Sequence, residues 1–279
     1  MRTLFHFRQD LRLTDNTWLI QALQDSKEVV PVFIFDTDIL DSFPKPDRRL
    51  LFLIEAVKNL DSQLREQGSG LIVRVGKSTE IIPELMKEYS CKALYHNRSY
   101  GTGSQTRDKT LQKSCEEHGR IYKNFSDYLL VEPGDVEQRK VFTPFFGLWK
   151  KRLVDQNKGN PSAFGTSLSQ GRTNEGTQVP WSIYSSNLYS QGSLSSLLVK
   201  GLKAENLVED LLKQLYTLWY LSTDGKNSIP TGHPKRPIEW RKNRFLQDFW
   251  NYDISRNTLW EDGTTKLSPY LRFGLLSIR

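Results

Sequence analysis

The sequence contains little cysteine and no long hydrophobic run. Its two cysteines, Cys91 and Cys115, are too few for a disulfide framework and lack the spacing of metal ligands. No apolar stretch reaches the ~18–20 residues of a membrane span, and Arg8, Asp10 and Arg12 interrupt the start of the chain before a signal-peptide core can form. We therefore expect a cytoplasmic protein with no structural zinc and no membrane partner.

The sequence also lacks the signatures of several enzyme classes. It has four histidines and no carboxylates clustered at useful spacing, so neither a metal-dependent hydrolase nor a Ser/His/Asp hydrolase has support. No glycine-rich dinucleotide fingerprint and no P-loop motif follows a predicted strand, which argues against an ordinary nucleotide-binding fold of either kind. These patterns identify no catalytic residue and no metal site.

The charge is moderately basic. The 39 Lys and Arg residues exceed the 32 Asp and Glu residues and give a net charge of +7. A surplus of this size suits a polyanionic partner such as nucleic acid, but proteins that never touch nucleic acid also carry it. Charge alone therefore leaves a nucleic-acid partner open.

The first half of the sequence alternates short apolar segments with longer amphipathic ones. The short segments, rich in β-branched and aromatic residues, are predicted strands: 3–7, 29–36, 71–76, 92–97 and 120–125. The longer segments have apolar residues at helical spacing: 16–26, 46–67, 79–89 and 105–118. Because parallel strands need crossover connections, this rhythm predicts a doubly wound, five-stranded parallel α/β sheet over residues 1–132.

Ligands of doubly wound sheets bind beyond the carboxyl ends of the strands. The loops to inspect are therefore residues 6–15, after the first strand, and residues 97–105, after the fourth. The charged run 8–12 in the first loop is interpreted as an ion-pair cluster that stabilises the turn, with a ligand grip as the alternative. His6 alternates with phenylalanines and is expected to be buried.

The alternation of strands and helices ends near Pro133. Residues 141–153 have the pattern of a short helix, whereas residues 155–191 are rich in Ser, Gly, Asn and Thr and have no periodicity. Long connections of this kind are usually functional or join separate units. Residues 133–192 are therefore interpreted as an interdomain linker.

Residues 193–279 are helical in pattern and are interpreted as the beginning of an all-α domain. A segment of about 85 residues with three or four helices makes a poor independent domain. Its last helical segment, residues 267–279, is expected to leave an open apolar face at Leu271, Leu275 and Leu276.

Two segments of this half carry polar chemistry. Hydroxyl residues and Lys266 precede the last predicted helix within residues 263–271, which suits an anion site but also an ordinary helix N-cap. Basic and aromatic residues are interleaved over residues 233–256, as beside phosphates and bases, although a solvated helix face explains the same pattern. Neither segment decides between its two meanings alone.

Taken in order, six segments resemble the photolyase/cryptochrome family. They are FHFRQDLRLTDN at 5–16, VFIFDTDIL at 32–40, DRRLLFL at 47–53, RDKTLQ at 107–112, VFTPFFGLWKKRL at 141–153 and YDISRNTLWEDGTTKLSPYLRFGLLSIR at 252–279. The first and last are the specific motifs. The segment that begins VFTPF is more similar to the class I branch, which repairs DNA.

The resemblance implies a flavoprotein in which light-excited reduced FAD gives an electron to a cyclobutane pyrimidine dimer in damaged DNA, after the lesion is flipped out of the duplex. It implies a possible antenna chromophore in the N-terminal domain and FAD in the helical domain. The residues that match the family's FAD-binding positions are Tyr252, Thr264, Thr265, Lys266, Leu267 and Ser268. Arg256 matches a DNA-contacting arginine, and weak, salt-sensitive DNA contacts are expected from Arg241, Lys242 and Arg244.

The sequence departs from the family pattern at several positions. Position 6 is His where Trp is usual, and Lys266 stands where Arg is common, which exchanges a planar fork for a point charge. Gly103 and Ser104 stand where some members have the Asn–Glu pair that grips folate. A folate antenna is therefore not expected, whereas a deazaflavin, another flavin or no antenna stay open.

Members of this family extend beyond the point where this sequence ends, by roughly the length of a further domain. We therefore expect a C-terminally truncated, monomeric photolyase-like chain that does not hold FAD tightly or repair DNA alone. Two alternatives stay open. One is a cryptochrome-type blue-light photoreceptor, and the other is a non-enzymatic nucleotide- or antenna-binding α/β module.

Overall fold

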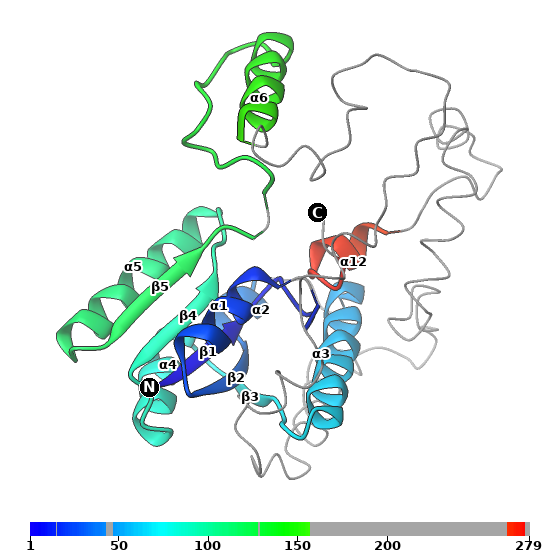
Figure 1. Cartoon of the computed structure of the whole chain (residues 1–279). Coiled ribbons are helices and arrows are strands. Elements are labelled where there is room, and N and C mark those ends of the chain that lie inside the picture. The colour runs from blue at the N-terminus through cyan, green and yellow to red at the C-terminus, as the bar shows by residue number, and fades with distance from the viewer. Residues whose placement is uncertain (15, 43–46, 128, 157–266, 277–279) are drawn as a thin grey trace, which may run out of the picture.

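A computed structural model of the chain describes residues 1–14, 16–42, 47–127, 129–156 and 267–276 (Figure 1). The strands are β1 (Arg2–Phe7), β2 (Glu28–Phe35), β3 (Ile72–Val75), β4 (Ala93–Asn97) and β5 (Ile121–Phe125). The helices are α1 (Thr17–Asp25), α2 (Thr37–Leu40), α3 (Arg48–Glu66), α4 (Ser78–Glu88), α5 (Thr102–Glu117), α6 (Phe142–Gln156) and α12 (Ser268–Arg272).

The five strands form one parallel sheet in the order β3-β2-β1-β4-β5, with β1 paired to both β2 and β4. The chain leaves β1 toward one edge through β2 and β3, and then returns to build the other edge with β4 and β5. The predicted doubly wound α/β sheet is therefore confirmed, and all five predicted strands are present. The strand order reverses between β1 and β4, where doubly wound sheets bind their ligands.

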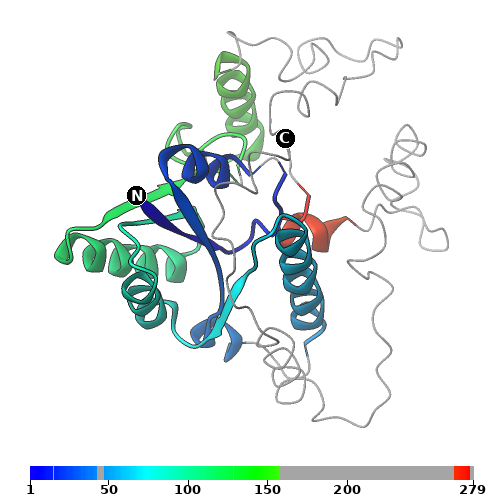
Figure 2. The ribbon, with the colours of Figure 1, turned by 60° about the horizontal axis from the view of Figure 1, so that its bottom comes forward.

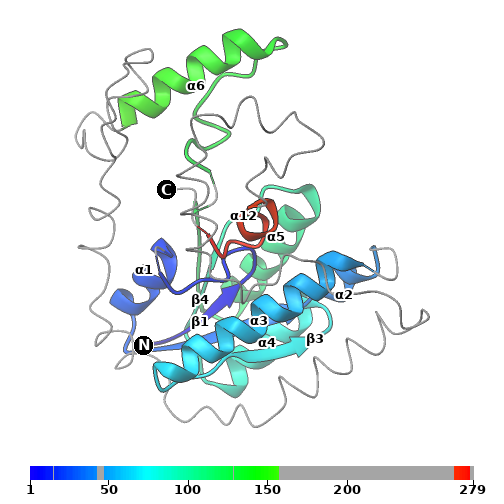
Figure 3. The same cartoon turned by 90° about the vertical axis from the view of Figure 1, so that its right-hand side faces the viewer.

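Helices cover both faces of the sheet (Figures 2 and 3). Neighbouring strand residues enter different cores, because successive side chains of a strand point to opposite faces. Phe5 packs with residues of α1 and α3, whereas Leu4 packs with residues of α4 and α5. The strands are thus buried on both faces, which explains their continuous apolar character.

Helix α3 shows how the sequence sets its own boundaries. Asp47 caps its first turn by accepting the backbone N–H of Arg49 at 2.8 Å. Gly68, with φ of 75°, follows the helix, and the N–H of Ser69 reaches back to the carbonyl of Leu64 at 2.9 Å. Gly68 therefore ends this helix, one residue after the predicted range 46–67.

The short helix α12 docks on the N-terminal domain beside α3 (Figures 1 and 3). The backbone N–H of Leu11 donates to the carbonyl of Phe273 at 3.1 Å, and Tyr270 is fully buried. The rings of Tyr270 and Phe273 lie 5.3 and 5.6 Å from the ring of Phe52 on α3. Residues 267–276 are therefore part of the same hydrophobic core as the sheet.

This docking corrects the prediction of an open apolar face at the end of the sequence. Leu275 is buried, and Leu271 and Leu276 pack against the core beside α1 and α3. The helix is also shorter than predicted, because Gly274 takes a positive φ of 66° directly after the cap residue Phe273. The apolar face exists, but the N-terminal domain covers it.

The predicted helix at residues 141–153 is present as α6. Most of the predicted linker (133–192) and of the predicted helical domain (193–279) lies outside the described residues. Within the described part, no helix is long and apolar enough to cross a membrane. The same part holds no group of three or more His, Cys, Asp or Glu side chains that suits a metal ion.

Candidate functional site

A cavity of about 190 Å³ lies beyond the carboxyl ends of β1 and β2. Its apolar lining comes from the strand ends, from the short helix after β2, from α3 and from the docked C-terminal segment. Representative apolar residues are Phe33, Ile39, Leu53 and Phe273. The lining is therefore assembled from segments at opposite ends of the sequence.

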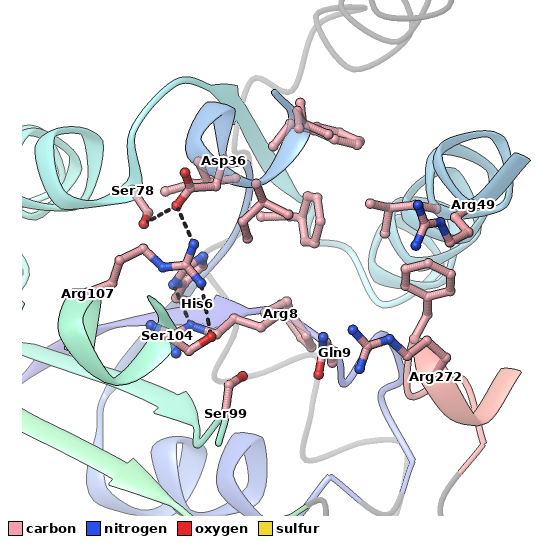
Figure 4. Close-up of a pocket in the computed structure, with 18 residues that line it drawn as sticks. His6, Arg8, Gln9, Asp36, Arg49, Ser78, Ser99, Ser104, Arg107 and Arg272 are labelled. Atoms are coloured by element: carbon pink, nitrogen blue, oxygen red, sulfur yellow. Dashed lines mark hydrogen bonds and ion pairs between the residues drawn. The ribbon is translucent and has the colours of Figure 1, made fainter. Parts of the chain in front are cut away.

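The loop after β2 supplies Asp36, the one carboxylate among the described residues that line the cavity. Asp36 is 6% exposed and caps α2 by accepting the backbone N–H of Asp38. Its carboxylate also accepts the Ser78 hydroxyl at 2.6 Å and faces Arg107 Nη1 at 3.4 Å (Figure 4). Nη2 of Arg107 donates a hydrogen bond to Ser104 Oγ at 3.1 Å. This end of the cavity is polar but close to neutral in charge.

Arg8 forms the floor of the cavity next to this cluster. Its Nη2 lies 2.6 Å from Asp108 Oδ1, and its Nε donates to His6 Nδ1 at 3.4 Å. Its third nitrogen, Nη1, is buried and has no hydrogen-bond partner among the described residues. The side chain is thus held on two sides, and it keeps one unused donor.

The sequence predicted an ion-pair cluster among Arg8, Asp10 and Arg12, but the ion pairs of the two arginines run to residues farther along the chain. Arg8 pairs with Asp108 on α5, and Arg12 pairs with Asp127 at 2.6 Å. Asp10 instead accepts the backbone N–H of Arg8 at 2.6 Å. The charged run therefore ties the first loop to the β4 side of the sheet, and Arg8 and Gln9 also line the cavity.

Asp10 belongs to a buried amide network at the point where the strand order reverses. Its carboxylate accepts Asn97 Nδ2 at 2.6 Å, and Asn16 caps α1 from the same cluster. Burial raises the pKa of Asp10, and the hydrogen bond from the Arg8 backbone opposes this shift. The network joins the ends of β1 and β4 to the start of α1, so its role is structural.

His6 is buried as predicted, and its surroundings keep it neutral. Desolvation lowers the pKa of His6 well below its usual value, and the charges of Arg8 and Arg107 act in the same direction. His96 lies behind it, with its Nε2 2.9 Å from the hydroxyl of Tyr122. Desolvation and Arg8 likewise hold the pKa of His96 far down. A neutral His6 can accept the Nε–H of Arg8, as the geometry requires.

These two histidines predict a loss of stability in acid. The folded chain keeps both rings neutral, whereas the unfolded chain protonates them near pH 6.5. Their contribution is therefore fully present above pH 6.5 and decreases as the pH falls, with a limiting slope of about 1.4 kcal/mol per pH unit for each histidine. Denaturant unfolding at pH 7.5, 6.5 and 5.5 measures this slope.

His96→Phe should remove one histidine's share of that slope. His118→Gln, at an exposed histidine after α5, serves as the control and should keep the slope of the unchanged chain. The raised pKa of Asp10 gives an effect of opposite sign, which begins as the pH rises above its usual value of 3.8 and ends at its pKa in the folded chain. An identical slope in the unchanged chain and in His96→Phe would contradict the prediction.

The sequence pointed to two of the loops that build the cavity. Arg8 and Gln9 come from the predicted loop 6–15, and Ser99 and Ser104 come from the predicted loop 97–105. The loop after β2 was missed, although Asp36 directly follows an apolar strand at the same edge of the sheet. The three remaining arginines of the lining were also missed: Arg49, Arg107 and Arg272.

Of the predicted FAD-binding residues, two are described. Leu267 is 8% exposed and packs in the core, so only its backbone is available to a ligand, whereas Ser268 is exposed at the start of α12. The other predicted FAD-binding and DNA-binding residues lie outside the described residues: Tyr252, Thr264, Thr265, Lys266, Arg256, Arg241, Lys242 and Arg244.

The strand order and the cavity define a doubly wound α/β protein with a cavity at the carboxyl edge of its sheet. The family model described as DNA photolyase matches residues 3–162, which is more than half of the sequence. The chain belongs to the DNA photolyase family.

Individual relatives agree with this assignment. The chain is 28% identical over 286 residues to the deoxyribodipyrimidine photo-lyase of a Synechococcus species, covering 99% of this chain and 52% of that protein. It is 30% identical over 155 residues to Cryptochrome DASH of Natronomonas pharaonis, covering 52% of this chain and 32% of the relative. The chain therefore spans about half the length of the photolyase, and the match includes a cryptochrome.

A solved structure with the same fold is that of the archaeal photolyase from Sulfolobus tokodaii. The two chains superpose with a TM-score of 0.66 at 26% identity, covering 99% of this chain and 53% of the other. That structure is described as containing two FAD molecules, with the implication of a novel light-harvesting cofactor.

Proposed function

We propose that the chain is part of a photolyase-type flavoprotein that uses light to transfer an electron from reduced FAD to pyrimidine dimers in DNA, and that the described cavity holds a light-harvesting chromophore. The observation that carries the second half is the cavity itself. It lies beyond the carboxyl ends of the strands, has mostly apolar walls and brings a few polar groups together, as small-molecule sites do. The Sulfolobus photolyase with its two FAD molecules supports the same assignment.

The proposal also assigns a role to each part of the chain. Residues 1–132 form the chromophore domain, residues 133–192 link it, and residues 193–279 begin the FAD domain. Within the last part, Tyr252 and the segment 264–268 are proposed to bind the FAD phosphates. The basic residues proposed to contact DNA are Arg241, Lys242, Arg244 and Arg256.

A cryptochrome-type photoreceptor is the second candidate, because the match to Cryptochrome DASH covers half of this chain. The two functions share a fold and a flavin, and they differ in what the protein must recognise. A repair enzyme must prefer damaged over intact duplex, whereas a receptor need not. Binding of the complete protein to duplexes with and without a thymine dimer separates the two candidates.

The chromophore role is tested by a fluorescence binding screen of the purified chain with FAD, a deazaflavin and a folate. We expect a flavin or deazaflavin to bind, because Gly103 and Ser104 stand where some family members have the Asn–Glu pair that grips folate. Ile39→Trp should weaken binding about tenfold or more, since a large ring in the cavity displaces the ligand.

Ile121→Trp is the matched control for this screen. Ile121 is 44% exposed on β5 and Ile39 is 40% exposed, but Ile121 does not line the cavity. If no chromophore binds, or if both substitutions weaken binding equally, the chromophore role is wrong. Light-dependent loss of thymine dimers by this chain with added FAD would instead contradict the expectation that it does not repair DNA alone.

A further inference from the structure

Helix α6 lies apart from the sheet and from the helices on its two faces (Figures 1 and 3). Its inner side packs on the segment before it, where Leu153 joins Val131 in a small cluster separate from the two cores of the sheet. The residues of its outer side are exposed: Val141, directly before the helix, by 62%, Phe142 by 72% and Phe146 by 45%. They are the three most exposed large apolar side chains among the described residues. This side of α6 is therefore open to a partner.

The outer side of α6 forms an aromatic ridge, which consists of the rings of Phe142, Phe146 and Trp149. The Phe146 ring stacks on both of the others, with its centroid 5.7 Å from Phe142 and 6.0 Å from Trp149 and interplanar angles of 16° and 14°. Rings that stack in this way lose little further freedom on binding, so the ridge is a preformed surface. It extends over two turns of α6, or about 10 Å, which suits the apolar face of another helix better than a small molecule.

The charges beside the aromatic ridge are positive. Lys140, Lys150 and Lys151 are exposed, and none of them forms an ion pair within the described part of the chain. The arginines of the same stretch, Arg139 and Arg152, each already pair with a carboxylate. The ridge therefore has uncompensated positive charge near both of its ends.

A second copy of α6 does not match this surface. Two aromatic ridges packed antiparallel would bring Lys140 of one copy beside Lys150 of the other, and parallel packing would bring identical lysines together. Like charges that meet at an interface cost affinity. The occupant that fits has an apolar stripe at helical spacing and an excess of carboxylates.

Residues 205–221 of the same chain, which lie outside the described residues, have this composition. Their leucines recur at the spacing of an amphipathic apolar stripe: Leu207, Leu211, Leu215 and Leu218. Their charged residues are one base and three acids, although the whole chain is basic: Lys213, Glu205, Glu209 and Asp210. The chain runs through this segment between α6 and the docked residues 267–276, so its effective concentration at the aromatic ridge is high.

We propose that residues 205–221 cover the aromatic ridge, with their leucines on the rings and their carboxylates beside Lys150 and Lys151. The contact needs neither a chromophore nor FAD, so it goes beyond the proposed function. Burial of the exposed rings drives it, because exposed ion pairs contribute little to stability. The charges instead select this segment over other apolar ones.

Photo-crosslinking of the full chain tests which segment occupies the aromatic ridge. A photoreactive benzophenone amino acid replaces Phe142, which keeps an aromatic side chain at the most exposed position of the ridge. After irradiation, mass spectrometry should find the main crosslink within residues 205–221. The same amino acid at Ile121, which is 44% exposed on the edge strand β5, is the control and should give no link to that segment. A main crosslink to another segment or to a second copy, or no crosslink at all, would overturn the proposal.

Hydrogen exchange of residues 205–221 tests the role of the charges. Lys150→Glu together with Lys151→Glu should speed this exchange about fivefold at low salt, because protection of the segment depends on its docking. Adding Glu209→Lys and Asp210→Lys to the same chain restores opposite charges and should restore most of the protection.

The matched control is Lys109→Glu together with Lys113→Glu on α5. These lysines are also exposed, and the change in net charge is the same, but they lie on a different helix from the aromatic ridge. Exchange of residues 205–221 should therefore stay as in the unchanged chain. Equal exchange rates in the two pairs of lysine substitutions would contradict the assignment of this segment to α6.

Discussion

Replacing Asp127 by Ala is expected to lower the free energy of unfolding by about 3–5 kcal/mol, which is the range for removing one partner of a buried ion pair. The side chains of Asp127 and Arg12 are 3% and 8% exposed, and their charged atoms lie 2.6 Å apart. Without the carboxylate, the Arg12 guanidinium stays in the interior and loses the ion pair with Asp127. Chemical denaturation followed by far-UV circular dichroism measures the loss.

The exposed pair Lys113 and Glu117 provides the control. Its side chains are 78% and 57% exposed, so Glu117→Ala should change stability by less than about 0.5 kcal/mol. Replacing both buried partners with apolar residues, Arg12→Met with Asp127→Leu, should regain part of the loss, because no buried charge is then left alone. A similar effect of Asp127→Ala and Glu117→Ala would contradict the predicted importance of burial.

Replacing Gly274 by Ala is expected to detach residues 267–276 from the N-terminal domain. A Cβ atom at this position would lie 2.0 Å from the carbonyl oxygen of Gln9 and 2.6 Å from the Cα of Asp10, and both are backbone atoms. The positive φ of 66° adds strain for any residue with a Cβ. The Leu11 amide, which donates to Phe273, should therefore exchange with solvent at least about 30-fold faster.

Hydrogen exchange followed by mass spectrometry or NMR reports this detachment directly. Gly147→Ala in α6 is the matched control, since a Cβ there meets nothing within 4 Å and should stabilise the helix by roughly 0.5–1 kcal/mol. Unchanged protection of Leu11 in Gly274→Ala would show that the close approach to Gln9 does not hold the segment in place. Because Phe273 lines the cavity, detachment of this segment should also weaken the binding of any ligand there.

The sheet was predictable from the sequence because its signals are local. Short β-branched strands alternate with amphipathic helices, and the crossover rule then leaves few topologies. The boundaries of α3 were also local, since Gly68 provides the turn that ends it. The four-residue helix α2 was missed because it is too short to show a period.

The docking of α12 could not be predicted in this way. Tyr270 and Phe273 meet Phe52 across most of the length of the chain, and no local pattern indicates which surface a short apolar helix will cover. The ion pairs of Arg8 with Asp108 and of Arg12 with Asp127 could not be predicted for the same reason, because each joins residues about 100 positions apart. Two of the three arginines that the sequence did not indicate, Arg107 and Arg272, reach the cavity only through the folded sheet and the docked segment.

The residues proposed to bind flavin and DNA come from family likeness. They rest on matched motifs in the second half of the chain, whereas the cavity rests on contacts within the described residues. The binding screen and the dimer-repair assay therefore test separate parts of the proposal.

The docking of residues 267–276 also delays completion of the cavity during protein synthesis. A ribosome adds about 5–20 residues per second, so roughly 7–30 seconds pass between the synthesis of β5 and that of Phe273. During this interval the sheet is already complete, but the ring of Phe52 and the amide of Leu11 await their partners on α12. The cavity of a nascent chain is therefore incomplete until residues 267–276 have been synthesised. A ligand that needs contacts with this segment can bind only after that.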